Sequence, residues 1–303
     1  MLDAHQLNVF LIAAETLNFT QAANKLGMSQ PSVSQHIKSL ERFFSTPLFI
    51  RSPRNLKLSD AGSALIPLAR EMVKQSIHIE ETMSSLQGEV FGHLIVGCST
   101  TPGKYILPHL LTRFHKEHAK VRITCQVSPQ TQAIEMLSEG EVNFALTSLI
   151  KEKSGVVEFR KFMRDNITLI VPLDHPWAAQ KIIQPKALYE VDFLMREQDS
   201  GTFSAVNSAL SNIGMQTNAL NTLMTLGNSE AIALSVQEGL GVGFVSEIVV
   251  TMLGQGRVTP IGIEGLEIYR EIYIGHNTKQ LRTVAQHAFW EFVQNLPYPF
   301  PLS

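Results

Sequence analysis

The sequence predicts a chain of three parts: an α-helical winged helix-turn-helix N-terminal domain, a long linker helix, and an α/β domain of two lobes. Residues 20–58 hold two helical patterns separated by a glycine, and residues 65–86 keep a coiled-coil spacing of apolar side chains. From Gly92, apolar runs of strand length alternate with helical stretches. A length of 303 residues fits two or three domains. We expect their boundaries at 1–59, 60–88 and 92–303.

The first helix is expected over residues 4–17, where it braces two shorter helices. Its apolar residues Leu7, Phe10, Leu11 and Ala14 recur at helical spacing. The second helix, residues 20–26, ends at Gly27, which is free to adopt the positive φ of a tight turn. Ser29 then fits the N-cap of a third helix, and Pro31 its first turn, where a missing N–H group is harmless.

The third helix has two faces of different chemistry. An inward stripe is formed by Val33, Ile37, Leu40 and Phe44. The opposite face carries Gln30, Ser32, Gln35 and Lys38, which can hydrogen-bond base edges and hold a phosphate. Two helices joined by a short glycine-containing turn form the helix-turn-helix pattern, although a solvated helical hairpin has the same spacing.

Charge favours the nucleic-acid interpretation. Residues 20–58 hold six basic residues against Glu41 alone, a net charge of +5, whereas the whole chain carries −2. A basic segment on an acidic protein is the electrostatic footprint of a localised nucleic-acid site. Residues 46–57 fit a two-stranded wing, and its Arg51 and Arg54 are expected to lie along the phosphate backbone.

The N-terminal fifth of the chain carries a specific set of residues. They are Leu7, Phe10, Ala14-Glu15, Asn18-Phe19-Thr20, Ala22-Ala23, Leu26, SQPSVSQHIKSLE (29–41), TPLF (46–49), Arg51, Leu58 and Ala61-Gly62. This set resembles the LysR-type transcriptional regulators. The resemblance implies a winged helix-turn-helix on double-stranded promoter DNA, self-association as a dimer or tetramer, and RNA polymerase as a candidate partner. The residues expected to contact DNA are Thr20, Gln30, Pro31, Ser32, Ser34, Gln35, Lys38, Arg51 and Arg54.

A long helix is expected from Ser59 to about Gln87, and its apolar seam suggests pairing. The seam consists of Leu65, Ala69, Met72, Ser76, Ile79, Met83 and Leu86, spaced 4-3-4-3-4-3. A helix packed on its own domain is the alternative interpretation. The resemblance implies that this helix pairs with the same helix of a second chain, so we expect dimerisation through every seam residue except Ser76.

The segment after Gly92 predicts an α/β sheet with right-handed parallel crossovers. Strands are expected at 93–99, 121–127, 142–148, 167–173, 192–195, 241–246 and 267–277, and helices at 102–118, 131–138, 203–213, 229–238 and 283–296. The resemblance implies an effector domain of periplasmic-binding-protein-like fold. Its lobe 1 is expected at about 92–162 and 266–297, and its lobe 2 at about 163–265.

Three loops at the carboxyl ends of strands are rich in hydroxyls and small residues, where ligands of open parallel sheets bind. They are Ser99-Thr100-Thr101, Ser200-Gly201-Thr202 and Gly227-Asn228-Ser229, with Thr147 at the end of another strand. Free amide groups at helix starts, together with hydroxyl donors, favour a carboxylate, phosphate or sulfate. The alternative interpretation of each loop is an N-cap that satisfies only its own helix.

The resemblance implies a small-molecule effector between the lobes, at the first two of these loops. The residues expected to bind it are Ser99, Thr100, Thr101, Thr147, Ser200, Gly201, Thr202 and Asn228. Family members often carry arginine after Ser-Gly-Thr, whereas this chain has Phe203. The nearby cations Lys104 and Arg196 could substitute for that arginine, or could simply lie at the surface or in ion pairs.

Enzyme and metal motifs are incomplete. Residues 97–105 resemble a phosphate loop, but their glycines are wrongly spaced and Tyr105 replaces the required Ser or Thr. The glycines of 239–243 do not begin a helix, and His115 and His118 have no carboxylate partner in a metal pattern. We therefore expect no catalysis, no metal and no cofactor.

The remaining composition indicates a cytoplasmic protein. No apolar run reaches membrane-spanning length, and the N-terminus lacks the early cations of a signal peptide. Cys98 and Cys125 fit a reducing compartment, and both are expected to be buried packing residues rather than a redox pair. Together, these observations predict a ligand-responsive DNA-binding regulator. The alternatives are a solute-binding receptor of the same lobed fold and a sequence-neutral architectural DNA binder.

Overall fold

The computed structural model describes residues 1–51, 56–85, 90–150, 155–253, 256–279 and 282–302. The chain divides into two compact units, residues 1–89 and 90–303. Within the described residues, no helix is both long and apolar enough to cross a bilayer.

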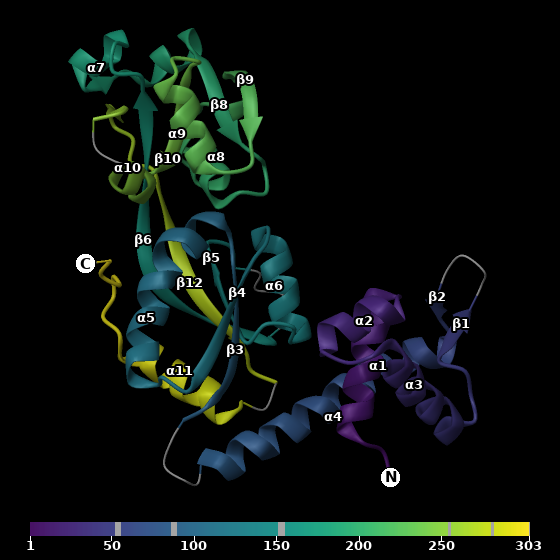
Figure 1. Ribbon diagram of the computed structural model, residues 1–303. Coiled ribbons are helices and arrows are strands. Elements are labelled where there is room, and N and C mark those ends of the chain that lie inside the picture. Colours follow the sequence, from purple (N-terminus) through teal and green to yellow (C-terminus); the bar gives the residue numbers. More distant parts are fainter. Residues whose placement is uncertain (52–55, 86–89, 151–154, 254–255, 280–281, 303) are drawn as a thin grey trace. The chain divides into compact units, whose positions relative to one another are not determined.

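The first unit contains four helices and a hairpin among its described residues (Figure 1). They are α1 (Ala4–Thr16), α2 (Phe19–Leu26), α3 (Gln30–Phe44), β1 (Phe49–Arg51), β2 (Leu56–Leu58) and α4 (Asp60–Ser85). As expected, Gly27 takes φ 64° at the end of α2, and the Ser29 hydroxyl accepts the amide N–H of Ser32 to cap α3. The helix-turn-helix is therefore fixed by local turn and cap chemistry.

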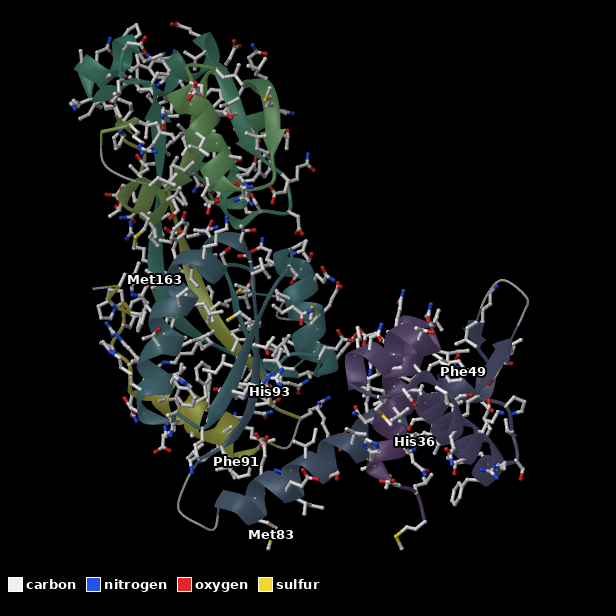
Figure 2. All side chains as sticks on the ribbon, in the orientation of Figure 1. His36, Phe49, Met83, Phe91, His93 and Met163 are labelled. Carbon is white, nitrogen blue, oxygen red and sulfur yellow. The ribbon has the colours of Figure 1, made fainter. Side chains whose placement is uncertain are left out.

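Aromatic rings form the centre of this unit. Phe49 of the hairpin, labelled in Figure 2, packs edge-on against Phe10 and Phe19, with ring centroids 5.8 and 5.4 Å apart. The predicted inward stripe of α3 is confirmed at Val33, Ile37 and Leu40, which are all buried. Its fourth member, Phe44, is half-buried against the same core.

The second unit is built on a ten-stranded sheet, and its described residues form two hydrophobic clusters in each lobe. Its described strands are β3 (Gly92–Cys98), β4 (Val121–Val127), β5 (Phe144–Thr147), β6 (Val157–Val171), β7 (Ile182–Ile183), β8 (Asp192–Arg196), β9 (Asn221–Leu226), β10 (Val242–Ser246), β11 (Thr259–Ile263) and β12 (Tyr269–Asn277). The strand order is β4-β3-β5-β12-β6-β10-β8-β9, with β11 beside β6 and β7 beside β11.

Helices cover both lobes (Figure 1). Those of lobe 1 are η1 (Pro102–Ile106), α5 (Leu107–Glu117), α6 (Gln130–Glu139) and α11 (Val284–Asn295). Those of lobe 2 are α7 (Pro176–Gln180), η2 (Pro185–Glu190), α8 (Gly201–Asn212), η3 (Thr217–Ala219), α9 (Ser229–Gln237) and α10 (Glu247–Leu253). The predicted fold class is thus confirmed: a winged helix-turn-helix and a two-lobed α/β domain.

Two long strands join the lobes. In lobe 1, β6 pairs antiparallel with β12, from Val157 opposite Asn277 to Asn166 opposite Tyr269. Beyond Asn166, the same strand pairs with β10 and β11 of lobe 2. The strand expected at 167–173 is therefore only the second half of β6. Its first half was missed because EFRKFMRDN has too many charged residues for an obvious apolar run.

Other expectations need correction. The helix expected over residues 102–118 consists of a π-helical turn, η1, followed by α5. The short strand β7 and the strands β9 and β11 were not predicted. β9 has no buried side chain, since it is the last strand along the main path of the sheet. Cys98 is buried as expected, but Cys125 is exposed because β4 lies at the other end of that path.

Candidate nucleic-acid interface and ligand cleft

The face of α3 that is expected to meet DNA is open to solvent. Gln30, Pro31, Gln35 and Lys38 are exposed, and Ser32 and Ser34 are half-buried. Thr20, at the start of α2, is exposed as well. Arg54 and the side chain of Arg51 lie outside the described residues, so the wing contacts stay a prediction.

Glu41, the only acidic residue between positions 20 and 58, has a structural role. Its Oε1 accepts the backbone N–H groups of Leu48 and Phe49, at 2.9 and 3.2 Å. The carboxylate thereby fixes the hairpin to α3, and the exposed face keeps Lys38 and Arg42 as its charged groups. The sequence alone did not reveal this role, since it depends on a contact between α3 and β1.

The burial of the apolar side chains of the linker helix α4 decreases along its length. Leu65 and Ala69 are 9% and 1% exposed and belong to the core of the first unit, with Met72 half-buried against it. Further along, Ile79 and Met83 are each 61% exposed (Met83 is labelled in Figure 2). Leu65 and Ala69 were expected on the pairing surface, but they pack within the core of their own unit and are not available for pairing. Leu86 lies outside the described residues.

In the second unit, several residues expected to bind an effector make hydrogen bonds within the protein. Ser200 caps α8 by accepting the Phe203 N–H at 3.0 Å, and Asn228 caps α9 by accepting the Ala231 N–H at 2.7 Å. Thr147 is fully buried, and its hydroxyl accepts the Leu149 N–H at 3.0 Å. Capping is therefore an established role of Ser200 and Asn228.

The structure brings residues next to the predicted loops together across the two lobes. A Cβ atom placed on Gly201 of α8 would lie 2.0 Å from the Oγ of Ser148, the residue after β5. On another side, Lys104 of η1 pairs with Glu230 of α9, Nζ to Oε1, at 2.9 Å. A third link joins Thr131 of α6 to Asp199, Oγ1 to Oδ2, at 3.0 Å. Ser99 and Thr100 are half-buried just before η1, and Thr101 is buried.

Lys104 and Arg196 were expected as substitutes for the arginine that Phe203 replaces. Both are already in ion pairs. Lys104 binds Glu230, as above, and Arg196 donates from Nη2 to Glu197 Oε1 at 2.6 Å. Arg196 also donates to the Ser229 hydroxyl at 3.2 Å, and its side chain is only 6% exposed. Neither cation is therefore a free anion clamp.

A network of buried polar side chains lies at the junction of the lobes, and it was not predicted from the sequence. Arg270 of β12 pairs with Asp165 of β6, with Nε to Oδ2 at 2.8 Å. The Ser246 hydroxyl donates to Asp165 Oδ1 at 2.5 Å, and Arg270 Nη1 donates to Thr202 Oγ1 at 3.3 Å. Of these residues only Thr202 was marked by the sequence, since Asp165 and Arg270 lie far apart in the chain and meet only through the strand register.

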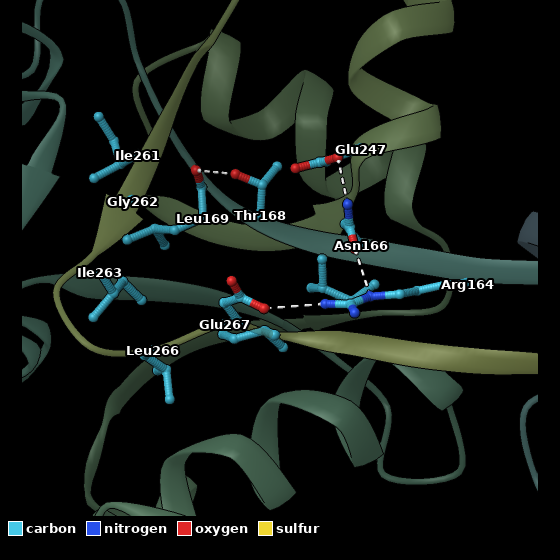
Figure 3. Close-up of a pocket in the computed structure, with 12 residues that line it drawn as sticks. Arg164, Asn166, Thr168, Leu169, Glu247, Ile261, Gly262, Ile263, Leu266 and Glu267 are labelled. Carbon is cyan, nitrogen blue, oxygen red and sulfur yellow. Dashed lines mark hydrogen bonds and ion pairs between the residues drawn. The ribbon is translucent and has the colours of Figure 1, made fainter.

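Two cavities flank this junction. One, of about 570 Å³, lies between the small residues of α8 and the strand β12, and Ser148, Gly201 and Arg270 help to line it. The other, of about 290 Å³, lies beside β6 and β11 (Figure 3). There Arg164 pairs with Glu267 at 3.1 Å, and Asn166 donates to Glu247 at 3.2 Å, above an apolar wall that includes Ile261. None of the predicted effector residues lines this second cavity.

The described residues offer no cluster of His, Cys, Asp or Glu able to hold a metal ion. Burial, with a smaller contribution from Cys125, raises the pKa of Cys98 to about 12. Burial also raises the pKa of Cys125. Burial therefore disfavours the reactive thiolate form at both positions.

Comparison with known proteins covers nearly the whole chain. Residues 4–63 match the model "Bacterial regulatory helix-turn-helix protein, lysR family", and residues 87–297 match "LysR substrate binding domain". The transcriptional activator CmpR of Synechocystis is 31% identical over 285 residues, which cover 93% of this chain and 92% of that protein. A probable RuBisCO transcriptional regulator of Cyanidium caldarium is 29% identical over 293 residues, 93% of this chain and 91% of that protein.

Solved structures share the fold. Full-length CbnR in complex with its target DNA has a TM-score of 0.68 and 18% identity, over 97% of this chain and 99% of that one. The regulatory domain of CcmR from Synechocystis, in complex with 2-PG, has a TM-score of 0.60 and 24% identity, over 67% of this chain and 95% of that one.

Proposed function

The chain belongs to the LysR family of transcriptional regulators, and from this premise we propose which of its residues read promoter DNA and which bind an effector. The observation that carries the proposal is the exposed polar face of α3, from which the Glu41 carboxylate is withdrawn. The proposed division of labour is DNA binding by residues 1–59, linkage and pairing by 60–88, and effector binding by 92–303.

On DNA, α3 enters the major groove as the recognition helix. Its amide and hydroxyl side chains, led by Gln35, hydrogen-bond base edges, while Lys38 and the wing arginines Arg51 and Arg54 contact phosphates. Pro31 and the Ser29 cap hold the first turn of α3 rigid, so its exposed residues approach the bases with little conformational entropy to lose. The solved complex of CbnR with its target DNA supports this use of the fold.

Self-association uses the second half of α4. Ile79 and Met83 are each 61% exposed, and they continue the coiled-coil spacing beyond the residues that the first unit buries. Two chains paired through this surface present two recognition helices, and two half-sites give a more selective target than one. A tetramer would follow from further pairing of such dimers.

The effector is a small molecule held where the lobes meet, near Ser99, Thr100 and Thr202. Structures of a CcmR regulatory domain with 2-PG and of a QuiR effector domain with shikimate support a small-molecule ligand for this fold. Binding shifts the relative pose of the lobes, and the pose sets the spacing of the DNA-binding heads. The protein is proposed to act in the cytoplasm, on promoter DNA with RNA polymerase, and not as an enzyme.

The direct test is equilibrium binding of the purified full-length chain to labelled duplexes, measured by fluorescence anisotropy at several salt concentrations. We expect affinity that depends on sequence and falls steeply with salt. Undetectable binding at low salt, or equal affinity for every sequence, would refute the proposal. A solute receptor of the same fold would give the first of these results.

A further inference from the structure

The turn η1, at the edge of lobe 1, has an unusual backbone. It is π-helical, and the N–H of Leu107 donates to the carbonyl of Pro102. Such turns are rare, and they occur frequently at functional sites. The turn packs tightly on its own lobe, because a Cβ on Gly103 would lie 2.7 Å from the Sγ of Cys98. Glycine at this position therefore lets η1 lie close against lobe 1.

Two side chains of η1 reach across to lobe 2. Lys104 Nζ lies 2.9 Å from Oε1 of Glu230, in the first turn of α9, and the Tyr105 hydroxyl donates a hydrogen bond to the same carboxylate. The ring of Tyr105 packs against the apolar cluster of lobe 2 that contains Ile232 and Val236. The backbone of η1 thus belongs to lobe 1, whereas two of its side chains are bound to lobe 2.

This contact can open without leaving a charge stranded in the interior. The side chain of Lys104 is 50% exposed while it is paired, so water already solvates it. Glu230 is 13% exposed, but the positive end of the α9 dipole stabilises its carboxylate after Lys104 has left. Arg270 and Asp165 differ, because they are 6% and 0% exposed and their separation would leave two buried charges. The η1 contact is therefore suited to reversible opening.

A second contact between the lobes lies at the start of α6. Thr131 Oγ1 donates to Asp199 Oδ2 at 3.0 Å, and this hydrogen bond is exposed. Water can replace an exposed hydrogen bond at little cost in free energy. The η1 contact combines an ion pair, a hydrogen bond and the burial of an aromatic ring, so it is the stronger of the two. We therefore expect η1 to determine how firmly the lobes stay together.

We propose that η1 is a latch between the lobes: Lys104 and Tyr105 dock on Glu230 and hold the lobes together in the absence of an effector, and the lobes separate at this edge only after the latch has released. The ring and hydroxyl of Tyr105 supply most of the attachment, and Lys104 contributes less because it is half-exposed. This inference goes beyond the proposed function, since the latch acts within the effector domain and requires neither DNA nor a bound ligand.

The test measures the distance between the lobes of the full-length protein by pulsed electron paramagnetic resonance. Spin labels are attached at Lys116→Cys in α5 of lobe 1 and at Lys186→Cys in η2 of lobe 2, which are both exposed positions. Cys125→Ser removes the exposed native thiol, and Cys98 is buried. A large excess of unlabelled chain restricts the signal to labels within one chain. We expect one narrow distance distribution in this reference protein.

Variants of the latch should add a second distance, from chains in which the lobes have separated. Tyr105→Phe keeps the ring and loses the hydrogen bond, so it should raise the ratio of open to closed chains about tenfold. Lys104→Met should raise this ratio about twofold. Tyr105→Ala, which also removes the ring from the lobe 2 cluster, should give the largest open population. Glu230→Ala should act at least as strongly as Tyr105→Phe, and adding Lys104→Met to it should change little, because the partner of Lys104 is already gone.

The matched control is Glu238→Ala, which removes an exposed carboxylate at the other end of α9 and should leave the distance distribution unchanged. Circular dichroism verifies that each variant is folded. Two outcomes overturn the latch: an unchanged distribution in both Tyr105→Ala and Glu230→Ala, or a change of the same size in Glu238→Ala.

If the alanine variants fail to fold, carbodiimide coupling of the native chain and of Tyr105→Phe replaces them. The reagent joins the Lys104 amine to the Glu230 carboxylate only while the two groups are in contact. The yield of this cross-link, measured by peptide mass spectrometry, should fall at least about twofold in Tyr105→Phe, although both coupled groups are unchanged. An equal yield in the two proteins refutes the latch.

Duplex binding by the same preparations tests the proposed function separately. Normal DNA binding together with unchanged lobe distances refutes only the latch. Absent DNA binding together with the expected second distance refutes only the proposed function.

Discussion

At the scale of single residues, the clearest contrast lies on α3, between Gln35 and Lys38. Both side chains are exposed, but an amide can read a base edge, whereas an ammonium holds a phosphate. We expect Gln35→Ala to reduce the discrimination between the preferred duplex and a mismatched one by about 1–3 kcal/mol. Lys38→Ala should weaken all duplexes alike and lower the salt slope by about one unit.

Anisotropy titrations of both variants against a matched and a mismatched duplex check this pair of predictions. Each variant serves as the control for the other, because both change one exposed side chain of the same helix. Equal loss of discrimination in the two variants would contradict the assigned roles.

A second residue-scale prediction concerns Glu230, which receives Lys104 and Tyr105 from the other lobe. Burial acts to raise the pKa of Glu230, but hydrogen bonds from Lys104, its own backbone and Tyr105 outweigh burial and hold the pKa below its ordinary value. Burial and the hydrogen bond to Glu230 raise the pKa of Tyr105 to about 12. The carboxylate therefore stabilises the fold above its ordinary pKa, and this contribution is lost as the pH falls through the lowered value.

We expect Glu230→Gln to destabilise the protein at pH 7 by at most about 1 kcal/mol, since half-exposed Lys104 is screened by solvent. The loss should shrink as the pH becomes acidic, because the wild-type carboxylate is then protonated too. Urea unfolding at a series of pH values measures it. The control is Glu117→Gln, which changes an exposed carboxylate in the same way. A loss independent of pH would rule out this charge-based account.

Residues whose roles depend on near neighbours in the sequence could be predicted. Residues whose roles depend on distant parts of the chain could not. Ser29, Gly27 and the stripe of α3 were predictable, because caps, turns and helix periodicity act over a few positions. Arg270 was not predictable, since its partner Asp165 is 105 positions away and only the register of β6 and β12 brings them together. The seam residue Leu65 shows the same limit: its spacing predicts a buried apolar position, but only the structure shows that its partners belong to its own unit.

At the scale of elements, α4 changes partner along its length, and this gives a third prediction. Ile79→Asp with Met83→Asp should abolish self-association and leave the first unit folded, because both side chains are 61% exposed. Ala69→Asp should instead unfold that unit, since it buries an unpaired charge at a position that is 1% exposed. Sedimentation velocity and circular dichroism distinguish the two results. Glu80→Ala, an exposed change on the same turns, should alter neither.

The start of α4 contains a fourth prediction, at Gly62. Glycine to alanine inside a helix normally stabilises it by about 0.5–1 kcal/mol. Here the added Cβ would lie 2.2 Å from the backbone oxygen of Leu48, so Gly62→Ala should destabilise the unit by about 1–3 kcal/mol. Chemical denaturation measures the sign. The exposed neighbour Ser63→Ala should stay within about 0.5 kcal/mol, and a stabilising Gly62→Ala would disprove the close contact.

At the scale of the whole molecule, the two units have separate cores. The core of the first is made of residues from Leu2 to Val73, and the cores of the second lie entirely beyond residue 89. We expect deletion of residues 1–89 to abolish duplex binding and to leave ligand binding by the remainder intact, because no shared core is lost. Anisotropy with the promoter duplex and calorimetry with glycolate and phosphate check both halves of this fifth prediction. Duplex binding that survives the deletion would mean that α3 is not the DNA reader.

The ladder formed by β6 and β12, whose register shifts once between Ile272 and Tyr273, has a mechanical consequence. A ribbon of two hydrogen-bonded strands is nearly inextensible, but it yields to torsion about its long axis. A compound bound beside such a ribbon can hardly push the lobes apart along it, yet it can change the twist of the ribbon. The signal that the effector domain transmits is therefore best described as a torque. The direction of this torque depends on which edge of the ribbon the compound contacts.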